Sequence, residues 1–475
     1  MTSRRASRNA PPPTRRRGAP WTPPDERWLD VTPALPDAPA VAAFPGSRAA
    51  ALASLGHLAV LREMLREGLP VHRMPLLDED PPESIEEGRP LRSYRLVAVS
   101  VAWELEAVDV VTALRRAGLE PDPARRGPDD PLIVAGGALT LVNPRPLLAF
   151  ADVVVVGEGI AAARVLAREA VAGASRTRLL NTIGALPNVL LAAEADDASA
   201  AACQAAALPL YTAGPGPLAS PVVADSSAFG DAYLVEACRG CPCGCTYCVL
   251  RRGRCGPYAA YDVADVLAAV PDGVRRVGLV GGGVSDHPGL ECLLESLSAR
   301  GIGVTTSSLR VGALTERRVR LLAAAGARQL TVGVDGLSAA LRRSIEKPLP
   351  DERIVALAEA AHAAGIESLK LYVMFGLPGE TPDAVDEFAA LVERVRQAVR
   401  VHVSAGPLVP KPATPLGGAP FAPLAHLRAV RAALRERLGS VVAGLDTGSI
   451  RTARREHELA HADLATARRL VGLES

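Results

Sequence analysis

Five of the eight cysteines stand within eleven residues, in the run Cys238-Arg-Gly-Cys241-Pro-Cys243-Gly-Cys245-Thr-Tyr-Cys248. Cysteines so closely grouped can form disulfides or bind a metal or an iron–sulfur cluster. A disulfide knot is disfavoured, because a chain of 475 residues has room for a large core and shows no secretory signal. A structural zinc site stays open as an alternative, since two Cys-x-x-Cys pairs are present. Zinc ribbons, however, usually separate their pairs by a long loop.

Three of these cysteines have a spacing suited to a cluster. Cys241, Cys245 and Cys248 follow the pattern Cys-x3-Cys-x2-Cys, and Tyr247 directly precedes the last of them. Three thiolates on a short loop can ligate three irons of a cubane and leave the fourth iron open for another ligand. We therefore predict one [4Fe-4S] cluster held by Cys241, Cys245 and Cys248.

Composition gives no general attraction for nucleic acid or membrane. Lys and Arg number 53 against 52 Asp and Glu, and no apolar run is long enough to span a bilayer. Residues 1–30 are rich in arginine and proline and are predicted to be a disordered basic tail. No apolar region follows the arginine pairs, as a twin-arginine export signal would require. We expect a cytoplasmic protein.

Residues 31–193 alternate apolar runs with helical patterns, which predicts a Rossmann-like α/β domain. Strands are expected at 41–44, 96–101, 132–135 and 153–156, with helices at 49–66 and 105–116. Ser100, Gly136-Gly137 and Gly157-Glu158-Gly159 follow three of these strands. Glycines there let a ligand approach the backbone closely, or they serve only to make tight turns.

The remaining sequence predicts a linker, a second α/β unit and a helical extension. Residues 194–226 pass from Ala-rich sequence into Gly and Pro, which indicates a linker. Residues 227–405 hold six strand patterns separated by helical ones, which suits a partial (β/α)6 barrel with functional groups after the strands. The strands are expected at 232–236, 277–280, 303–306, 329–334, 369–374 and 401–404. Helices over 425–438 and 452–473 are expected in the extension, residues 406–475.

The cysteine triplet at the end of the first of these strands, with polar turns after the others, resembles the radical SAM superfamily. The resemblance implies that the open iron binds S-adenosylmethionine (SAM) and that an electron from the cluster yields a 5′-deoxyadenosyl radical. Arg310 would pair with the SAM carboxylate, because guanidinium presents a bidentate fork. The SAM contacts implied by position are Gly281, Gly282, Gly283, Ser308, Arg310, Asp335, Gly376 and Glu380.

The first domain resembles the cobalamin-binding domain that precedes many radical SAM cores. The cobalamin contacts implied are Ser100, Gly136, Gly137, Gly157, Glu158 and Gly159. The chain departs from the family pattern in one respect: the usual Asp-x-His-x-x-Gly is absent. The equivalent turn, residues 45–48, reads Pro-Gly-Ser-Arg, and His57 falls inside the following helix. If cobalamin binds, we expect no protein histidine on its cobalt, with Arg48 near its lower face.

Together these resemblances imply a radical SAM enzyme that uses cobalamin to transfer a methyl group to an unactivated carbon of a small metabolite or peptide. A reductant such as flavodoxin or ferredoxin would supply electrons, and no membrane or nucleic-acid partner is indicated. Three alternatives stay open: a cobalamin-free radical cyclisation or rearrangement, a non-catalytic iron–sulfur carrier or sensor, and a zinc-binding regulatory protein. Neither the substrate nor a catalytic residue can be predicted. Cys238, Cys243, Cys255 and Cys292 receive no role.

Overall fold

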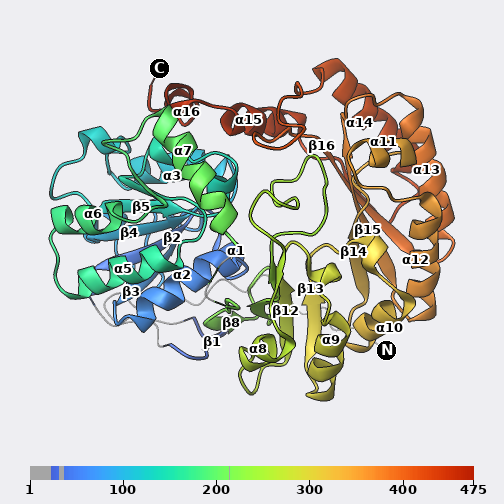
Figure 1. Ribbon diagram of the computed structural model, residues 1–475, viewed down its shortest axis with the longest axis horizontal. Helices are drawn as coiled ribbons and strands as arrows, with labels where there is room; N and C mark the ends of the chain where they lie inside the picture. The colour runs from blue at the N-terminus through green and yellow to red at the C-terminus, as the bar shows by residue number, and fades with distance from the viewer. Residues whose placement is uncertain (1–22, 32–36, 213, 215, 475) are drawn as a thin grey trace.

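The computed structural model describes residues 23–31, 37–212, 214 and 216–474 (Figure 1). Residues 1–22 of the predicted basic tail lie outside this range. The remainder of that tail is not unstructured, because residues Glu26–Trp28 form strand β1. Strand β1 pairs antiparallel with β8, Val222–Ala224, which lies in the predicted linker. That linker also contains helix α7, Asp197–Ala207, so it is an ordered part of the molecule.

The first domain is built on a six-stranded sheet in the order β3-β2-β4-β5-β6-β7. Its first five strands are parallel, and only β7 runs antiparallel. The chain winds outward in both directions from β2, so the carboxyl ends of β2 and β4 flank a topological switch point, where sheets of this type bind ligands. The strands are β2 Ala40–Phe44, β3 Val71–Pro75, β4 Leu96–Ser100, β5 Leu132–Gly136, β6 Val153–Val155 and β7 Val189–Leu191.

Both faces of this sheet are covered, as the continuous apolar runs of its strands require. On one face pack α2, Leu55–Arg66, α5, Ile160–Val171, and α6, Arg176–Gly184. On the other pack α3, Glu106–Arg116, and α7. The predicted helix over 49–66 is interrupted, because a short helix, α1, Arg48–Ala51, ends before α2 begins. Strand β3 escaped prediction because buried His72 and Arg73 mask its apolar character.

The second domain is a partial barrel of seven parallel strands. A three-stranded sheet, β9-β12-β13, and a four-stranded sheet, β14-β15-β16-β17, meet at a bridge between Leu309 and Val332. The seventh strand, β17, corrects the predicted count of six; three residues with a single apolar side chain gave no strand pattern. The bounds are β9 Tyr233–Glu236, β12 Arg276–Val280, β13 Gly303–Thr306, β14 Gln329–Gly333, β15 Ser368–Phe375, β16 Arg400–Pro407 and β17 Gly444–Asp446.

Helices cover the outside of the barrel (Figure 1). Along β15, Leu369, Leu371 and Val373 are buried under the helices, while Lys370 and Tyr372 alternate with them and are half-buried or exposed. The outer helices are α9 Leu290–Ala299, α10 Glu316–Ala324, α12 Asp351–Ala363, α13 Asp383–Arg396 and α14 Leu424–Leu438.

The end of the chain returns to the first domain. Figure 1 shows the red helices α15, Ile450–Ala460, and α16, Leu464–Leu470, crossing from the barrel to the first domain. Leu459, Ala460 and Val471 complete a core cluster of that domain. The predicted single helix over 452–473 is therefore two helices, and Asp463 caps the second. No helix among the described residues is long and apolar enough to cross a membrane.

Candidate functional site

The cysteine loop leaves β9 at the junction of the two domains. Cys238 belongs to the two-residue strand β10, Cys238–Arg239, and the loop with the other cysteines follows it. Arg254 braces the far end of the loop. Its guanidinium donates to the carbonyls of Leu141 in the first domain (2.8 Å), Val249 in the loop (3.0 Å) and Ala413 beyond β16 (2.7 Å). Arg254 thus ties the loop to the first domain and to the segment after β16.

The three thiols predicted to ligate a cluster lie together in this loop. Cys245 is buried, and Cys241 and Cys248 are half-buried. Burial raises the pKa of the Cys245 thiol and that of the Cys248 thiol. A charge on Cys248 raises the Cys245 pKa further. Among the described residues, no three His, Cys, Asp or Glu side chains converge on a point that could hold a single ion. A cubane does not require such convergence, because each thiolate binds a different iron.

Gly281, Gly282 and Gly283 follow β12 and lie against the cysteine loop. A Cβ on Gly281 would stand 2.5 Å from the Cys238 sulfur, and one on Gly282 would stand 3.1 Å from the Gly240 carbonyl oxygen. Any side chain here would collide with the loop. The glycine turn therefore allows β12 to end in direct contact with Cys238 and with the start of the cysteine loop.

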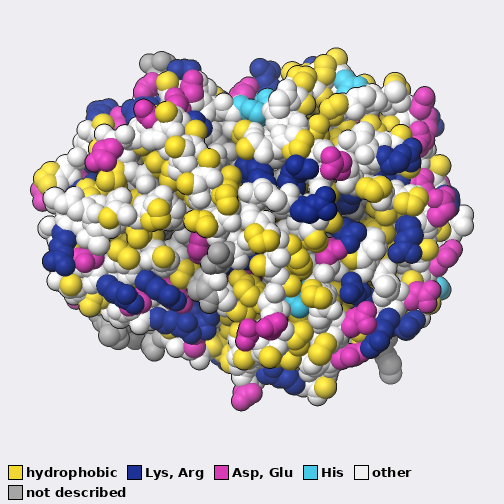
Figure 2. All heavy atoms as spheres, in the orientation of Figure 1, with side chains coloured by type: hydrophobic (Ala, Val, Ile, Leu, Met, Phe, Trp, Pro, Cys, Tyr) yellow, Lys and Arg dark blue, Asp and Glu magenta, His cyan; other side chains and the backbone are white. Residues whose placement is uncertain are grey.

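Arg310, at the end of the turn after β13, is already paired in this structure. Its guanidinium forms a bidentate ion pair with Asp286, from the turn after β12, with the Nε–Oδ2 contact at 3.0 Å. The hydrogen bond with Asp286 is the main cause of a raised Arg310 pKa, and Cys243 and Cys241 add to it against desolvation. Ser308 is exposed. Figure 2 shows Lys and Arg side chains gathered in this central region between the domains.

Asp335, after β14, connects directly to the cysteine loop. Its carboxylate accepts a hydrogen bond from the Tyr247 hydroxyl (2.7 Å) and pairs with the Lys347 ammonium. Burial, followed by the Asp335 charge, raises the pKa of Tyr247 above its usual range. The sequence singled out Asp335 but did not predict that Tyr247 and Lys347 both contact its carboxylate. Their distant positions in the chain carried no signal of this contact.

Gly376 and Glu380 form a turn that is braced from within. The Glu380 carboxylate is fully buried and accepts hydrogen bonds from the Gly376 backbone amide and from His426, both at 2.9 Å. A Cβ on Gly376 would stand 2.5 Å from a Leu427 methyl group at the start of α14. The turn after β15 is therefore shaped by α14. Both hydrogen bonds go to Glu380 Oε1, whereas Oε2 is buried and has no hydrogen-bond partner among the described residues.

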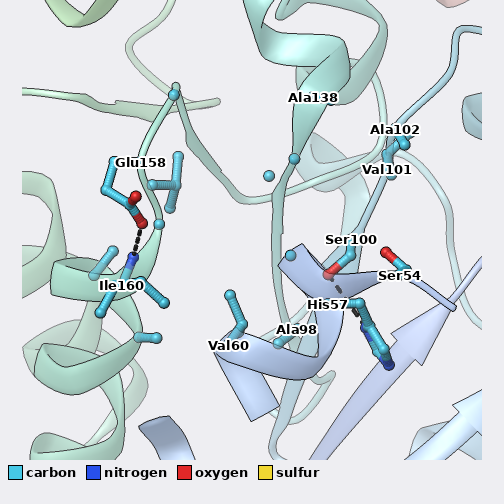
Figure 3. A pocket seen from close by; sticks show the side chains of 18 of the residues that line it. Ser54, His57, Val60, Ala98, Ser100, Val101, Ala102, Ala138, Glu158 and Ile160 are labelled. Atoms are coloured by element: carbon cyan, nitrogen blue, oxygen red, sulfur yellow. Dashed lines mark hydrogen bonds between the residues drawn. The ribbon is translucent and has the colours of Figure 1, made fainter. Parts of the chain in front are cut away.

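A cavity of about 310 Å³ opens at the carboxyl ends of β4, β5 and β6. All six residues predicted to contact cobalamin line it: Ser100, Gly136, Gly137, Gly157, Glu158 and Gly159. Figure 3 shows Ser100 and Glu158 on opposite sides of the cavity. Gly137 has a φ of 116°, and a Cβ there would stand 2.4 Å from the Val101 carbonyl oxygen, so only glycine fits.

The second domain closes this cavity. Glu236 and Arg239, at the end of β9 and in the cysteine loop, contribute to its lining. The buried Arg239 guanidinium donates from Nε to both Glu236 oxygens at 3.0 Å and pairs through Nη1 with Glu158. Its side chain is 1% exposed. Sequence reasoning missed Arg239, although a lone arginine inside a cysteine run was a signal.

His57 and Arg48, the two residues considered near the cobalt of cobalamin, lie in different surroundings. His57 lies on α2 in the cavity wall, is 3% exposed, and has its Nδ1 3.2 Å from the Ser100 hydroxyl. Burial, then the charge of Arg73, lowers the His57 pKa to about 4, so the ring is neutral. Arg48 does not line the cavity. Its guanidinium pairs with Asp25 and Glu26, and its expected place near the lower face of cobalamin stays a prediction.

Comparison with known proteins gives two family matches and several relatives. Residues 235–392 match the model of the radical SAM superfamily, and residues 75–191 match that of the N-terminal domain of radical SAM proteins. A curated relative, the uncharacterized protein MJ0966 of Methanocaldococcus jannaschii, is 28% identical over 330 residues, 68% of each chain.

Solved structures show the same fold. The cobalamin- and [4Fe-4S]-bound radical SAM methyltransferase TsrM of Kitasatospora setae is 16% identical, with a TM-score of 0.56 over 91% of this chain and 97% of that one. A second TsrM structure, with tryptophan substrate and a SAM analogue, is 19% identical, with a TM-score of 0.51 over 80% of this chain and 74% of that one. The overall arrangement of domains is thus shared at low identity.

Proposed function

We propose that this chain, whose residues 235–392 match the radical SAM superfamily, is a radical SAM enzyme that uses cobalamin to transfer a methyl group to an unactivated carbon. One observation carries the cobalamin part of the proposal. Six residues chosen from sequence for cobalamin line a single cavity, and the strand that leads into the cysteine loop closes it. The two predicted cofactor sites are therefore joined by one strand end.

Cys241, Cys245 and Cys248 would hold the [4Fe-4S] cluster. The SAM contacts would come from the Gly281–Gly283 backbone, Ser308 and Arg310. Asp335 would act through Tyr247 and Lys347, because both already contact its carboxylate. When bound, the cluster supplies the electron that cleaves SAM, and cobalamin carries the methyl group. A flavodoxin or ferredoxin would renew the electron.

The cavity suits part of a cobalamin molecule. At about 310 Å³ it is smaller than the corrin macrocycle with its side arms, so it would take the nucleotide arm. Its walls combine apolar side chains, such as Val60 and Ile160, with the Ser100 hydroxyl, as small-molecule sites generally do. The bare backbone of Gly137 would let the arm approach the sheet closely.

His57 would not ligate cobalt in this proposal. Its Nδ1 contacts Ser100, and its ring packs edge-on against Phe44 with centroids 5.3 Å apart. A neutral ring held on both sides would serve as cavity wall. The lower face of cobalamin would then carry no protein histidine.

Retention of cobalamin by the purified protein tests the proposal. The apoprotein is incubated anaerobically with hydroxocobalamin, excess is removed, and bound cobalt and iron are both measured. We expect about one cobalt per chain, and no change of the visible spectrum in His57→Gln. Val60→Phe, which fills the cavity, should lose cobalt yet keep its iron. Val171→Phe on the exposed side of α5 is the matched control and should keep both.

Two results would contradict the proposal in different ways. If the wild-type protein keeps no cobalt but releases 5′-deoxyadenosine from SAM, methyl transfer through cobalamin is wrong. The radical enzyme without cobalamin, catalysing a cyclisation or rearrangement, then takes its place. If no 5′-deoxyadenosine forms although the cluster is intact and reduced, the chain is an iron–sulfur carrier or sensor.

A further inference from the structure

A second cavity, of about 370 Å³, lies at the carboxyl ends of β15 and β16. Tyr247, the residue before Cys248, forms one side of it, and Met374 at the end of β15 forms another. Helix α15 of the C-terminal extension covers it with Thr452, Ala453 and Glu456. The cavity is thus next to the predicted cluster and is roofed by the segment that the sequence left without a function.

Lys411, in the segment after β16, is the charged centre of this cavity. Its ammonium contacts a carboxylate oxygen of Glu104 at 2.5 Å and one of Glu456 at 2.6 Å. Glu104 is 2% exposed and follows Ser100, the last residue of β4, by four positions. The first domain, the segment after the barrel strand β16 and the C-terminal extension therefore meet at one ammonium group.

We propose that this cavity binds the substrate, and that the substrate is a free α-amino acid with an apolar side chain. The inference rests on the proposed function, because it places the substrate beside the loop that would hold the cluster. Lys411 and Glu456 present a cation and an anion side by side at the cavity surface. An α-amino acid carries the complementary pair, with its carboxylate for Lys411 and its ammonium for Glu456.

The charges and the walls of the cavity support this class of substrate. The two carboxylates of Glu104 and Glu456 face the single ammonium of Lys411. This group of three side chains has an excess negative charge, which favours a cationic group on the ligand. Lys411 has three N–H groups, and the two carboxylates leave a third for the ligand. Met374, Leu408, Val409 and Ala453 supply an apolar surface for the side chain.

SAM also carries an aminocarboxylate group, so the test must keep the two ligands apart. Full-length protein, reconstituted anaerobically, is saturated with SAM, and its thermal midpoint is measured with each proteinogenic L-amino acid at about 10 mM. We expect a rise of about 2–4 °C for one or a few apolar amino acids. The N-acetyl and carboxamide forms of the same amino acids, each lacking one charge, should give no rise.

Variants assign the effect to the cavity. Glu456→Gln removes the carboxylate that would hold the ammonium and should abolish the rise, with SAM affinity unchanged. Glu458→Gln is the matched control on the same helix. The Glu458 side chain is 36% exposed, pairs with Arg454 and Arg455, and lies outside the cavity lining. The Glu458→Gln variant should therefore respond like the wild type.

Three results would overturn the inference. The first is that no amino acid raises the midpoint, and the second is that the singly charged derivatives raise it equally. The third is that Glu456→Gln weakens SAM binding about tenfold or more, which would make the cavity part of the SAM site. The cobalamin proposal is judged separately, because this measurement needs neither cobalt nor turnover.

Discussion

Arg239 of the cysteine loop and Glu158 at the rim of the N-terminal cavity form an ion pair across the domain junction. Arg239 also pairs with Glu236 and lies over the ring of Tyr211, 5.7 Å from its centroid. Burial tends to lower the Arg239 pKa, but Glu236 and Glu158 outweigh it and raise the pKa above its usual range. Arg239 is thus a fixed positive charge that holds the loop against the cavity.

Replacing Arg239 by Met should be costly to stability. The change leaves Glu158 and Glu236 without their cation, and removing one partner of a buried pair costs about 3–5 kcal/mol. Urea unfolding measures the loss. The matched control is Arg400→Met, which breaks a pair with Glu367 whose side chains are 66% and 56% exposed and should cost less than about 1 kcal/mol. An equal loss in both variants would show that the buried ion pairs of Arg239 contribute no more to stability than an exposed pair does.

The cysteine triplet should account for all the bound iron. Anaerobically reconstituted protein should contain about four irons, and the variant with Cys241, Cys245 and Cys248 all changed to Ala should contain almost none. Cys292→Ala removes an exposed thiol on α9 and should leave the iron unchanged. Iron analysis and the visible spectrum provide the measurement. Retention of iron by the triple variant, or zinc alone in the wild type, would contradict the assignment.

Arg310 should contribute to SAM binding even though Asp286 occupies two of its donors. Its guanidinium retains Nη1, and a charge-assisted hydrogen bond to the SAM carboxylate is worth about 1.5–3 kcal/mol. Arg310→Ala should weaken SAM binding roughly ten- to a hundredfold by equilibrium dialysis. Arg317→Ala, on the exposed face of α10, should bind SAM normally. Unchanged affinity in Arg310→Ala would remove this residue from the site.

His57 should make the first domain less stable in acid. Its folded pKa is about 4, against an ordinary value of 6.5, so below pH 6.5 the unfolded chain binds a proton that the folded chain excludes. The free energy of unfolding is therefore unaffected by His57 above pH 6.5, and it falls as the pH drops toward 4. Between pH 7 and pH 5 the loss should be about 2 kcal/mol.

Tryptophan fluorescence reports this unfolding, because Trp28 packs against the core of the first domain and Trp103 lies between β4 and α3. His57→Gln cannot take up the proton, so its stability should depend less on pH by the same amount. A pH dependence identical to that of the wild type would show that His57 is already accessible to protons when folded.

The sequence predicted those features of the fold that depend on residues close together in the chain. The spacing of Cys241, Cys245 and Cys248 is local, and glycine and polar residues at strand ends fall where parallel sheets place ligands. Strand order is not local, because no run of residues states that β2 lies between β3 and β4. Strand β17 was missed since its pairing with β16 depends on backbone hydrogen bonds rather than on apolar content.

Partners of site residues were the hardest to foresee. Arg310 was expected to await SAM, yet Asp286 stands 24 positions earlier and meets it only because β12 and β13 are neighbours. Glu380 was expected near a ligand, but His426, 46 positions later, helps to bury its carboxylate under α14. Such pairs form when distant segments are brought together, which a single sequence does not reveal.

The return of α15 and α16 to the first domain has a consequence for synthesis of the chain on the ribosome. Leu459, Ala460 and Val471 fill the same core as strands made some 400 residues earlier, since β2 ends at Phe44. At about 5–20 residues per second, the nascent domain must wait tens of seconds with that apolar surface uncovered. The first part of the protein to emerge is thus among the last to be completed.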